Sequence, residues 1–217
     1  MDNIRKQTLV EALKVSISSD RLATYLKAAG FDEDRALRLY LWNASIGEAF
    51  HLPIQAVEVG LRNCINFALC AEFGFDWWRN SSFLSQVDRE RGLDISTAER
   101  RIKNRGHPLV TSQIVATLSF GFWVGMLQPR FNPAIWSKHV RTAFLYLPDG
   151  KGRSDLAQSA KRAADLRNRI WHHEPIFKEN ISDEFRNVME LLAWICPEKA
   201  AWVRPHCRVL SLLRQKP

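Results

Sequence analysis

The stretch PIQAVEVGLRNCINFALCAEFG, residues 53–74, carries apolar side chains at intervals of three and four residues. The repeating positions are Ile54, Val57, Leu61, Ile65 and Leu69. This spacing places them along one face of an α-helix. Gly74 follows the last of them, at a position where glycine typically ends a helix. The stretch therefore predicts an amphipathic helix from Pro53 to Phe73.

Similar periodicity extends over most of the chain, whereas the alternation typical of β-strands is hard to find. A first helix is expected to carry Leu9, Leu13 and Ile17, and a second to run from a Ser19 or Asp20 cap to Gly30. His51-Leu52-Pro53 is expected to separate the helix over residues 32–50 from the helix over residues 53–73. The remaining helices are expected over residues 32–50, 97–104, 109–128, 134–147, 155–173, 183–195 and 198–213. The predicted fold class is all-α.

The composition indicates a folded chain with a phosphate-bearing partner. Of 217 residues, 46% are hydrophobic and 25% charged, with ten Gly and nine Pro, which excludes a disordered or collagen-like chain. The net charge is +8, and the 31 basic residues comprise 21 Arg and 10 Lys. A guanidinium group pairs with phosphate oxygens through two parallel hydrogen bonds. We therefore expect an Arg-rich surface that binds phosphate groups.

The cysteines and the N-terminal residues indicate in which cellular compartment the protein is expected. Cys64, Cys70, Cys196 and Cys207 have no C-x-x-C spacing and form no zinc pattern with the histidines. We expect reduced core cysteines, no metal, no cofactor and a cytoplasmic protein, because no apolar signal-peptide region follows Met1.

Residues 109–128 lack charged side chains and are long enough to span a bilayer. Their Thr, Ser and Gln side chains favour a central buried helix of a soluble protein over a membrane-associated effector.

The segment with the densest group of side chains able to bind phosphate or transfer protons is LRNRIWHHE, residues 166–174. Asn168 and His172 are four residues apart and share a helix face. His172 is expected near the negative end of the helix, where it suits proton transfer, and Arg167 can stabilise charge that develops on a phosphate. Without a metal, these groups suit cleavage of RNA, in which the 2′-OH of the substrate attacks the adjacent phosphorus.

The run from Arg167 to His172 resembles the R-x(4–6)-H motif of HEPN-domain ribonucleases. The longer stretch LRNRIWHHEPIF resembles the Abi-like, AbiD/AbiF-type abortive-infection branch of that superfamily. Residues 40–63, 106–127 and 191–203 resemble the same branch, so the likeness covers most of the chain. It implies one Abi-like HEPN domain over residues 1–217, a helical bundle with additional N-terminal and peripheral helices. Independently of the resemblance, the stretch PDGKGRS, residues 148–154, is the best candidate for a mobile loop or domain boundary.

The resemblance also implies a function. We expect a metal-independent endoribonuclease that acts as a toxin or phage-defence effector, with Arg167, Asn168 and His172 as catalytic residues. The expected partners are an RNA substrate, a second copy of the chain in a homodimer, and a small-RNA or protein antitoxin, with no membrane. The alternative is a non-catalytic RNA-binding or antitoxin-like helical protein.

Several other residues are supporting or RNA-binding candidates. Arg169 and His173 flank the motif, and Glu58, Arg62 and Asn63 form a second polar cluster. Glu58 and Arg62 stand at i and i+4, so they either form a surface ion pair or bring the cluster beside the Arg167 helix.

The loose motif does not select its site alone, because Arg100 and Arg101 match it with His107, and Arg167 matches it with His173. Trp77-Trp78 beside Arg79 are candidates for stacking on RNA bases, against an ordinary place in the core. The basic run of residues 99–105 is a candidate backbone-binding face, against an ordinary solvated helix.

Overall fold

The structure is a computed structural model that describes residues 11–217. Within that range the chain forms helices and loops and no β-strand, which confirms the all-α prediction. The α-helices are α2 (Ser19–Ala28), α3 (Glu33–Phe73), α4 (Ser81–Leu84), α5 (Arg89–Asn104), α6 (Thr111–Thr117), α7 (Phe120–Gly125), α8 (Ser137–Ala143), α9 (Arg153–Trp171), α10 (Ile181–Ile195), α11 (Pro197–Val203) and α12 (Val209–Leu213). Short 3₁₀ segments are η1 (Trp77–Arg79), η2 (Pro129–Phe131), η4 (Ile176–Lys178) and η5 (Arg204–His206), and η3 (Asn132–Trp136) is π-helical. Residues 11–17 are also helical, while Leu9 of the first predicted helix lies outside the described residues.

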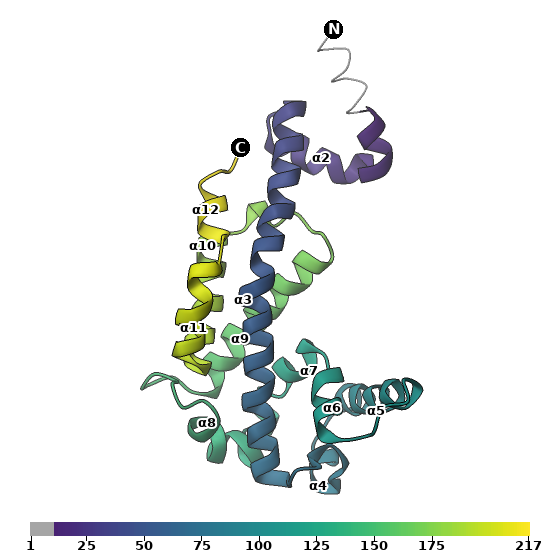
Figure 1. Cartoon of the computed structure of the whole chain (residues 1–217), viewed down its shortest axis with the longest axis vertical. Coiled ribbons are helices and arrows are strands. Elements are labelled where there is room, and N and C mark those ends of the chain that lie inside the picture. Colours follow the sequence, from purple (N-terminus) through teal and green to yellow (C-terminus); the bar gives the residue numbers. More distant parts are fainter. Residues whose placement is uncertain (1–10) are drawn as a thin grey trace.

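Helix α3 is the axis of the molecule (Figure 1). It is contacted by α2 near its start, by α6, α7 and α8 towards its end, and by α9, α10, α11 and α12 between. Its predicted apolar face is buried, with Ile54, Val57, Leu61, Ile65 and Leu69 each 0–1% exposed. The Asp32 side chain accepts a hydrogen bond from the Arg35 N–H at 2.9 Å and so caps the start of the helix.

The prediction that Pro53 separates two helices is wrong, because α3 runs for 41 residues through it. A proline inside a helix costs about 3 kcal/mol or more, since it lacks an N–H and its ring crowds the carbonyl four residues earlier. Here Phe50 and Ile54 are 0% and 1% exposed on either side of it. Burial of each large apolar side chain contributes about 1.5–3 kcal/mol. The packing on both sides of Pro53 therefore outweighs the local penalty.

The prediction of one buried helix over residues 109–128 is also wrong, because the chain forms α6 and α7 with a break at Leu118. The Ser119 hydroxyl accepts a hydrogen bond from the Phe122 N–H at 3.1 Å and starts α7 as a new helix. Both pieces remain buried, with Ile114 and Trp123 at 0% exposure. Among residues 11–217, no helix combines the length and the apolar character needed to cross a membrane.

Several boundaries differ from the prediction. The tail of residues 198–213 is split by η5, which contains Pro205, into α11 and α12. The segment 134–147 begins in the π-helical η3 and its α-helix ends at Ala143. Helix α5 starts at Arg89, well before residue 97, because the Asp88 side chain caps it. In contrast, α9 and α10 each lie within two residues of their predicted ends.

The indole rings of Trp77 and Trp78 belong to the core. They are 0% and 1% exposed, so the alternative of stacking on RNA bases is wrong for both. The Trp77 indole N–H donates to Asn66 Oδ1 at 2.8 Å and that of Trp78 donates to Thr111 Oγ1 at 3.1 Å. These bonds satisfy polar groups that burial would otherwise leave unpaired.

The predicted mobile segment and the cysteines have defined surroundings. Arg141 donates hydrogen bonds to the carbonyl oxygens of Leu147, Pro148 and Lys151 at 2.7, 3.2 and 2.8 Å, which tie residues 148–151 to α8. The four cysteines are free and half-buried rather than fully in the core. Burial raises the pKa of the Cys64 thiol to about 11, which favours the thiol over the thiolate.

Candidate functional site

The C-terminal end of α9 carries most of the predicted site residues. The His173 N–H donates to the Ile170 carbonyl at 3.0 Å and the Glu174 N–H to the Arg169 carbonyl at 2.9 Å. These two bonds form a Schellman motif, which satisfies the last carbonyl groups of the helix. His173 occupies the left-handed position of the motif, with φ of 56°, where glycine is usual. The motif turns the chain at His172 and directs residues 172–174 away from the helix axis.

Arg167 and Asn168 contact each other at this end of α9. The Arg167 guanidinium lies over the Trp171 indole, with Cζ 4.9 Å from the ring centroid. Its Nη1 donates to Asn168 Oδ1 at 3.3 Å. The Trp171 ring is 41% exposed, so the arginine and the indole together form part of the surface. Asn168 thus lies where it can orient the Arg167 guanidinium.

His172 and His173 are both exposed at the turn. Among residues 11–217, no side chain forms a hydrogen bond with the His172 imidazole. Within the described chain, the backbone N–H of this residue donates a hydrogen bond to the Asn168 carbonyl at 2.9 Å. Arg167, Asn168 and His172 share one helix end, but nothing in the described chain fixes the imidazole towards the guanidinium.

The second predicted cluster lies on α3, alongside α9. Gly47 allows the two helices to approach each other, since a Cβ atom there would lie 3.3 Å from Ile170 Cγ2. One turn beyond Gly47 on α3, the His51 imidazole stacks on the indole of Trp171, the residue after Ile170, at 5.6 Å between ring centroids. Glu58 and Arg62 continue the same face of α3 and, with Trp171, line a pocket of about 320 Å³. The structure thus brings Glu58 and Arg62 to the end of α9, whereas Asn63 is exposed and lines neither pocket described here.

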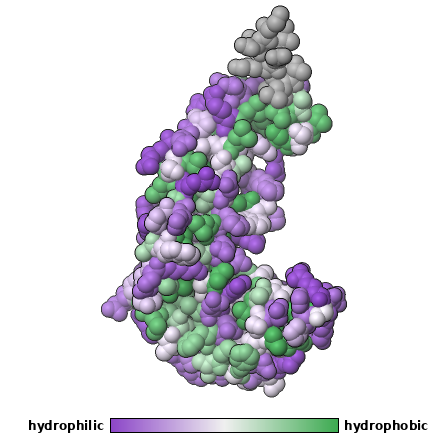
Figure 2. All heavy atoms as spheres, in the orientation of Figure 1, coloured by the Kyte–Doolittle hydropathy of each residue, from purple (hydrophilic) through white to green (hydrophobic). Residues whose placement is uncertain are grey.

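A larger pocket of about 700 Å³ lies on the other side of the stacked pair, and it is lined by both His51 and Trp171. Its remaining lining comes from α2, from the first half of α3 and from the turn after α9, including His173. Figure 2 shows the outline of the molecule hollowed between the α2 end and the part formed by α4–α7. The stacked rings of His51 and Trp171 therefore separate two adjacent pockets.

Two arginines of the site have no carboxylate partner within the described chain. Arg62 and Arg167 are half-buried, and the Nε of each is buried without a hydrogen-bond acceptor. Glu58, four residues from Arg62, forms no ion pair with it within residues 11–217. The simple surface ion pair is therefore absent, and the site keeps cationic groups without a counter-ion. Such groups are suited to binding an anion.

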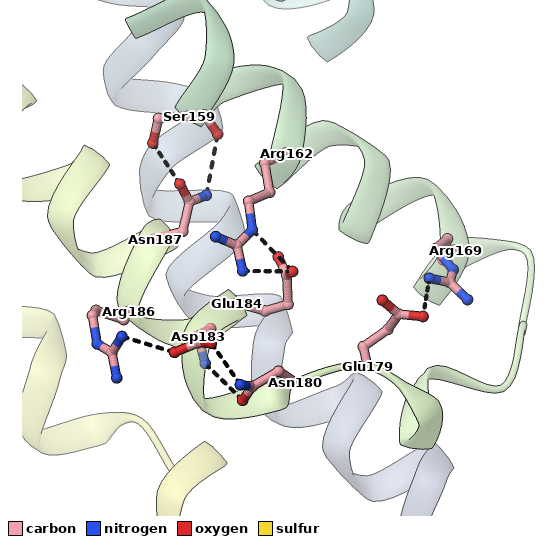
Figure 3. Close-up of polar contacts among 9 residues, drawn as sticks. All are labelled: Ser159, Arg162, Arg169, Glu179, Asn180, Asp183, Glu184, Arg186 and Asn187. Atoms are coloured by element: carbon pink, nitrogen blue, oxygen red, sulfur yellow. Dashed lines mark hydrogen bonds and ion pairs between the residues drawn. The ribbon is translucent and has the colours of Figure 1, made fainter. Parts of the chain in front are cut away.

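Within the described chain, Arg169, a predicted supporting or RNA-binding residue, is paired with carboxylates, unlike Arg62 and Arg167. It forms an ion pair with Glu174 at 3.2 Å. It forms another with Glu179 at 2.5 Å, across the loop that joins α9 to α10 (Figure 3). The hydrogen bond that the Arg169 guanidinium donates to the Glu179 carboxylate is the largest cause that raises the pKa of this guanidinium above its ordinary value. These pairs hold the turn and leave Arg169 committed to structure rather than to a ligand.

Polar contacts between α9 and α10 position the site helix. The Ser159 hydroxyl donates to Asn187 Oδ1 at 2.8 Å, and the Asn187 amide donates to the Ser159 carbonyl at 3.1 Å (Figure 3). One turn further on, Arg162 Nε donates to Glu184 Oε1 at 2.9 Å. Together with the buried Ala160, Ala163 and Ala164, these contacts fix α9 along its length.

Other candidates lie on the surface outside this region. Arg100, Arg101 and Lys103 are exposed on α5, and Arg105 and His107 are exposed in the turn that follows. The prediction did not include His51, because His51-Leu52-Pro53 was interpreted as a helix break. Its spacing of seven residues from Glu58 was the available signal, since that spacing corresponds to two turns of one helix face.

Comparison of the chain with protein-family models, with curated proteins and with solved structures finds no match. The geometry of the residues themselves is therefore the basis of a functional assignment.

Proposed function

We propose that the chain is a metal-independent endoribonuclease of the HEPN type, an Abi-like toxin or phage-defence effector. The observation that carries the proposal is the juxtaposition of Arg62 and Arg167, both without a carboxylate partner in the described chain, around the exposed indole of Trp171. Arginines without counter-ions beside an exposed aromatic ring suit a ligand with phosphate groups and bases. The motif resemblance and the +8 charge point in the same direction.

The proposed reaction is an internal displacement at phosphorus. The 2′-OH of the substrate attacks the adjacent phosphorus, the bond from oxygen to that phosphorus forms, and the bond from phosphorus to the 5′-oxygen breaks. His172 moves a proton, either from the attacking hydroxyl or to the departing oxygen. Arg167 neutralises the charge that develops on the phosphate oxygens, and Asn168 keeps its guanidinium in position. DNA lacks the attacking hydroxyl and is not a substrate.

The proposal includes a homodimer. A single His172 serves one proton transfer at a time, and its imidazole has no orienting side chain within the described residues. A second copy of the chain would supply a second motif and the missing contacts at a composite site. The same cationic surface would bind an inhibitory small RNA, or a protein antitoxin would cover it.

Cleavage of a labelled RNA in the presence of EDTA tests the proposal. His172→Ala and Arg167→Ala should each lower the cleavage rate by at least 100-fold, the loss typical of removing an acid–base or charge-stabilising group. His107→Ala is the matched control, because His107 is exposed and lies at the other match to the motif. Full cleavage by His172→Ala would reject the assignment. Salt-sensitive RNA binding without product in the wild type would favour the non-catalytic alternative.

A further inference from the structure

The pocket of about 700 Å³ between α2, α3 and the turn after α9 has an aromatic lining. Tyr25, Tyr40, His51 and Trp171 contribute four rings to its wall, and Ile170 adds an apolar side chain. Tyr25 and Tyr40 meet edge to face, with ring centroids 5.2 Å apart. Pockets of this volume are typical of small-ligand sites, and rings of this kind offer flat faces to a planar ligand.

One arginine of the pocket wall has no carboxylate partner within the described residues. The carboxylates of the pocket are paired with arginines, Glu48 with Arg208 at 2.8 Å and Glu174 with Arg169 at 3.2 Å. Arg21 also lines the pocket, and it forms no ion pair within the part of the chain that the structure describes. Burial raises the pKa of the Tyr25 hydroxyl to about 12, so this group stays neutral. The pocket therefore favours an aromatic ligand that also carries negative charge.

Two features keep this pocket in place. The Asn43 carboxamide oxygen accepts hydrogen bonds from the N–H groups of Ile176 and Phe177 at 2.8 and 3.1 Å, which fixes the segment after the turn against α3. His173 is held at φ of 56°, a conformation that strains a residue with a Cβ atom. A strained non-glycine residue in a pocket wall is a pointer to a ligand contact.

We infer that this pocket holds one nucleotide unit, with its base against the exposed Trp171 and the half-buried Tyr40, which the buried Tyr25 supports. The Arg167 guanidinium lies over the same Trp171 ring, 4.9 Å from its centroid. A base that enters the pocket beside Trp171 therefore leads its own phosphate to Arg167. The pocket would then select the nucleotide next to the cleaved bond. Because it identifies the ligand as part of an RNA strand, this inference rests on the proposed function.

This arrangement has a consequence for the substrate. A base inside a duplex cannot enter a pocket without being unpaired and unstacked first. The substrate class is therefore RNA with an unpaired base at the cleavage point, such as a loop or a single strand.

Binding of a 2′-O-methyl oligonucleotide tests the inference without any turnover, because this strand lacks the attacking hydroxyl. Ala44 lines the pocket at an exposed position of α3, so Ala44→Trp should fill the pocket and weaken binding of the labelled strand about tenfold in fluorescence anisotropy. Ala71→Trp is the matched control, since Ala71 is exposed on the same helix and lines neither pocket. It should bind as the wild type does. Tyr40→Leu provides a second variant with a smaller change of volume, and it should weaken binding in the same direction.

A strand in which one base at a time is replaced by an abasic site completes the test. One such replacement should weaken binding to the wild type about tenfold and leave binding to Ala44→Trp unchanged. An equal abasic effect in both proteins, or wild-type affinity in both pocket variants, would overturn the inference.

Adenosine monophosphate titrated into the same proteins distinguishes the two sources of the ligand. Saturable binding that Ala44→Trp abolishes would identify free nucleotides as a further ligand of the pocket. Base-dependent binding of the strand alone would identify the strand. Absence of both would overturn the inference. Cleavage that depends on His172 would survive that result, and base-dependent binding would equally survive a failure to detect cleavage.

Discussion

The Trp171 indole stacks on the His51 imidazole, with 5.6 Å between the ring centroids and 21° between the ring planes. This contact joins α3 to the end of α9 and forms the boundary between two pockets, because both residues line both of them. Arg167 contacts the same indole. Trp171 thus contacts the proposed phosphate-binding Arg167 and also lines both pockets.

Replacing Trp171 with alanine should impair function more than folding. The change removes the stack with His51 and the contact with the Arg167 guanidinium, which is worth about 0.5–2 kcal/mol. We expect kcat/KM for RNA cleavage to fall about 3- to 30-fold. The free energy of unfolding should change by about 1 kcal/mol or less, because the ring is 41% exposed. Trp171→Phe keeps a flat ring and should retain most of the activity, so equal loss in both variants would contradict this role.

Replacing His173 with glycine should stabilise the fold. Glycine adopts φ of 56° without the steric penalty that a Cβ atom brings, so the gain should be about 0.5–1 kcal/mol. Urea denaturation measures it as a higher midpoint. His172→Gly is the control, because His172 has φ of −86° and gains no relief from the change. A midpoint that rises equally in both variants would show that the left-handed conformation is not the cause.

Two glycine substitutions should have opposite effects on stability. A Cβ atom at Gly60 would lie 2.8 Å from Ile195 Cγ2, so Gly60→Ala forces α3 and α10 apart. We expect a loss of about 1–3 kcal/mol in the free energy of unfolding. Gly92 lies within α5, and no atom would come within 4 Å of its Cβ, so Gly92→Ala should add about 0.5–1 kcal/mol. Thermal melts of both variants check the contrast, and a stabilised Gly60→Ala protein would refute the packing of these helices.

Glu72 should contribute stability that depends on pH. Its carboxylate accepts a hydrogen bond from Lys138 Nζ at 2.6 Å and lies 3.0 Å from His139 Nε2. The Lys138 hydrogen bond, followed by that with His139, lowers the pKa of Glu72 below its ordinary value. A carboxylate with a lowered pKa in the folded state stabilises the protein above its unfolded pKa of about 4.3, and this contribution disappears as the pH falls through the folded pKa.

Urea denaturation from pH 7 down to about pH 3 should therefore show a stability gap between wild type and Glu72→Gln that closes below about pH 4. Glu190→Gln is the control, since Glu190 is exposed and has no ion-pair partner within residues 11–217. A gap that stays constant over this range would show that the ion pairs of Glu72 do not contribute.

The sequence predicted the fold best where caps and apolar spacing agree. Asp155 and Asn180 lie at the starts of α9 and α10, and a proline follows within four residues of each end, so the bounds of both helices follow from local residues. The predictions at Pro53 and at Ser119 are wrong in opposite directions: a break was expected within the continuous α3, and a continuous helix was expected where α6 and α7 are separate. Packing of distant residues outweighs the proline, and a single hydroxyl cap divides an apolar run that hydropathy alone presents as continuous.

The site was predictable in part. The polar residues at the end of α9 stand together in the chain, so their proximity needs no tertiary information. Their approach to Glu58 and Arg62 depends on how α9 crosses α3, which local spacing does not determine. His51 was missed because a helix break was assumed beside it, and once α3 is continuous it falls on the same face as Glu58.

The order of α3 and α9 along the chain also determines when the surface between them can form during synthesis. His51 and Arg62 emerge from the ribosome before Arg167 and Trp171, which lie 105 and 109 residues after Arg62. The surface that joins α3 to α9 therefore cannot assemble on a short nascent chain. Under the proposed function, RNA cleavage would require a chain that has been synthesised through α9 and has packed this helix against α3.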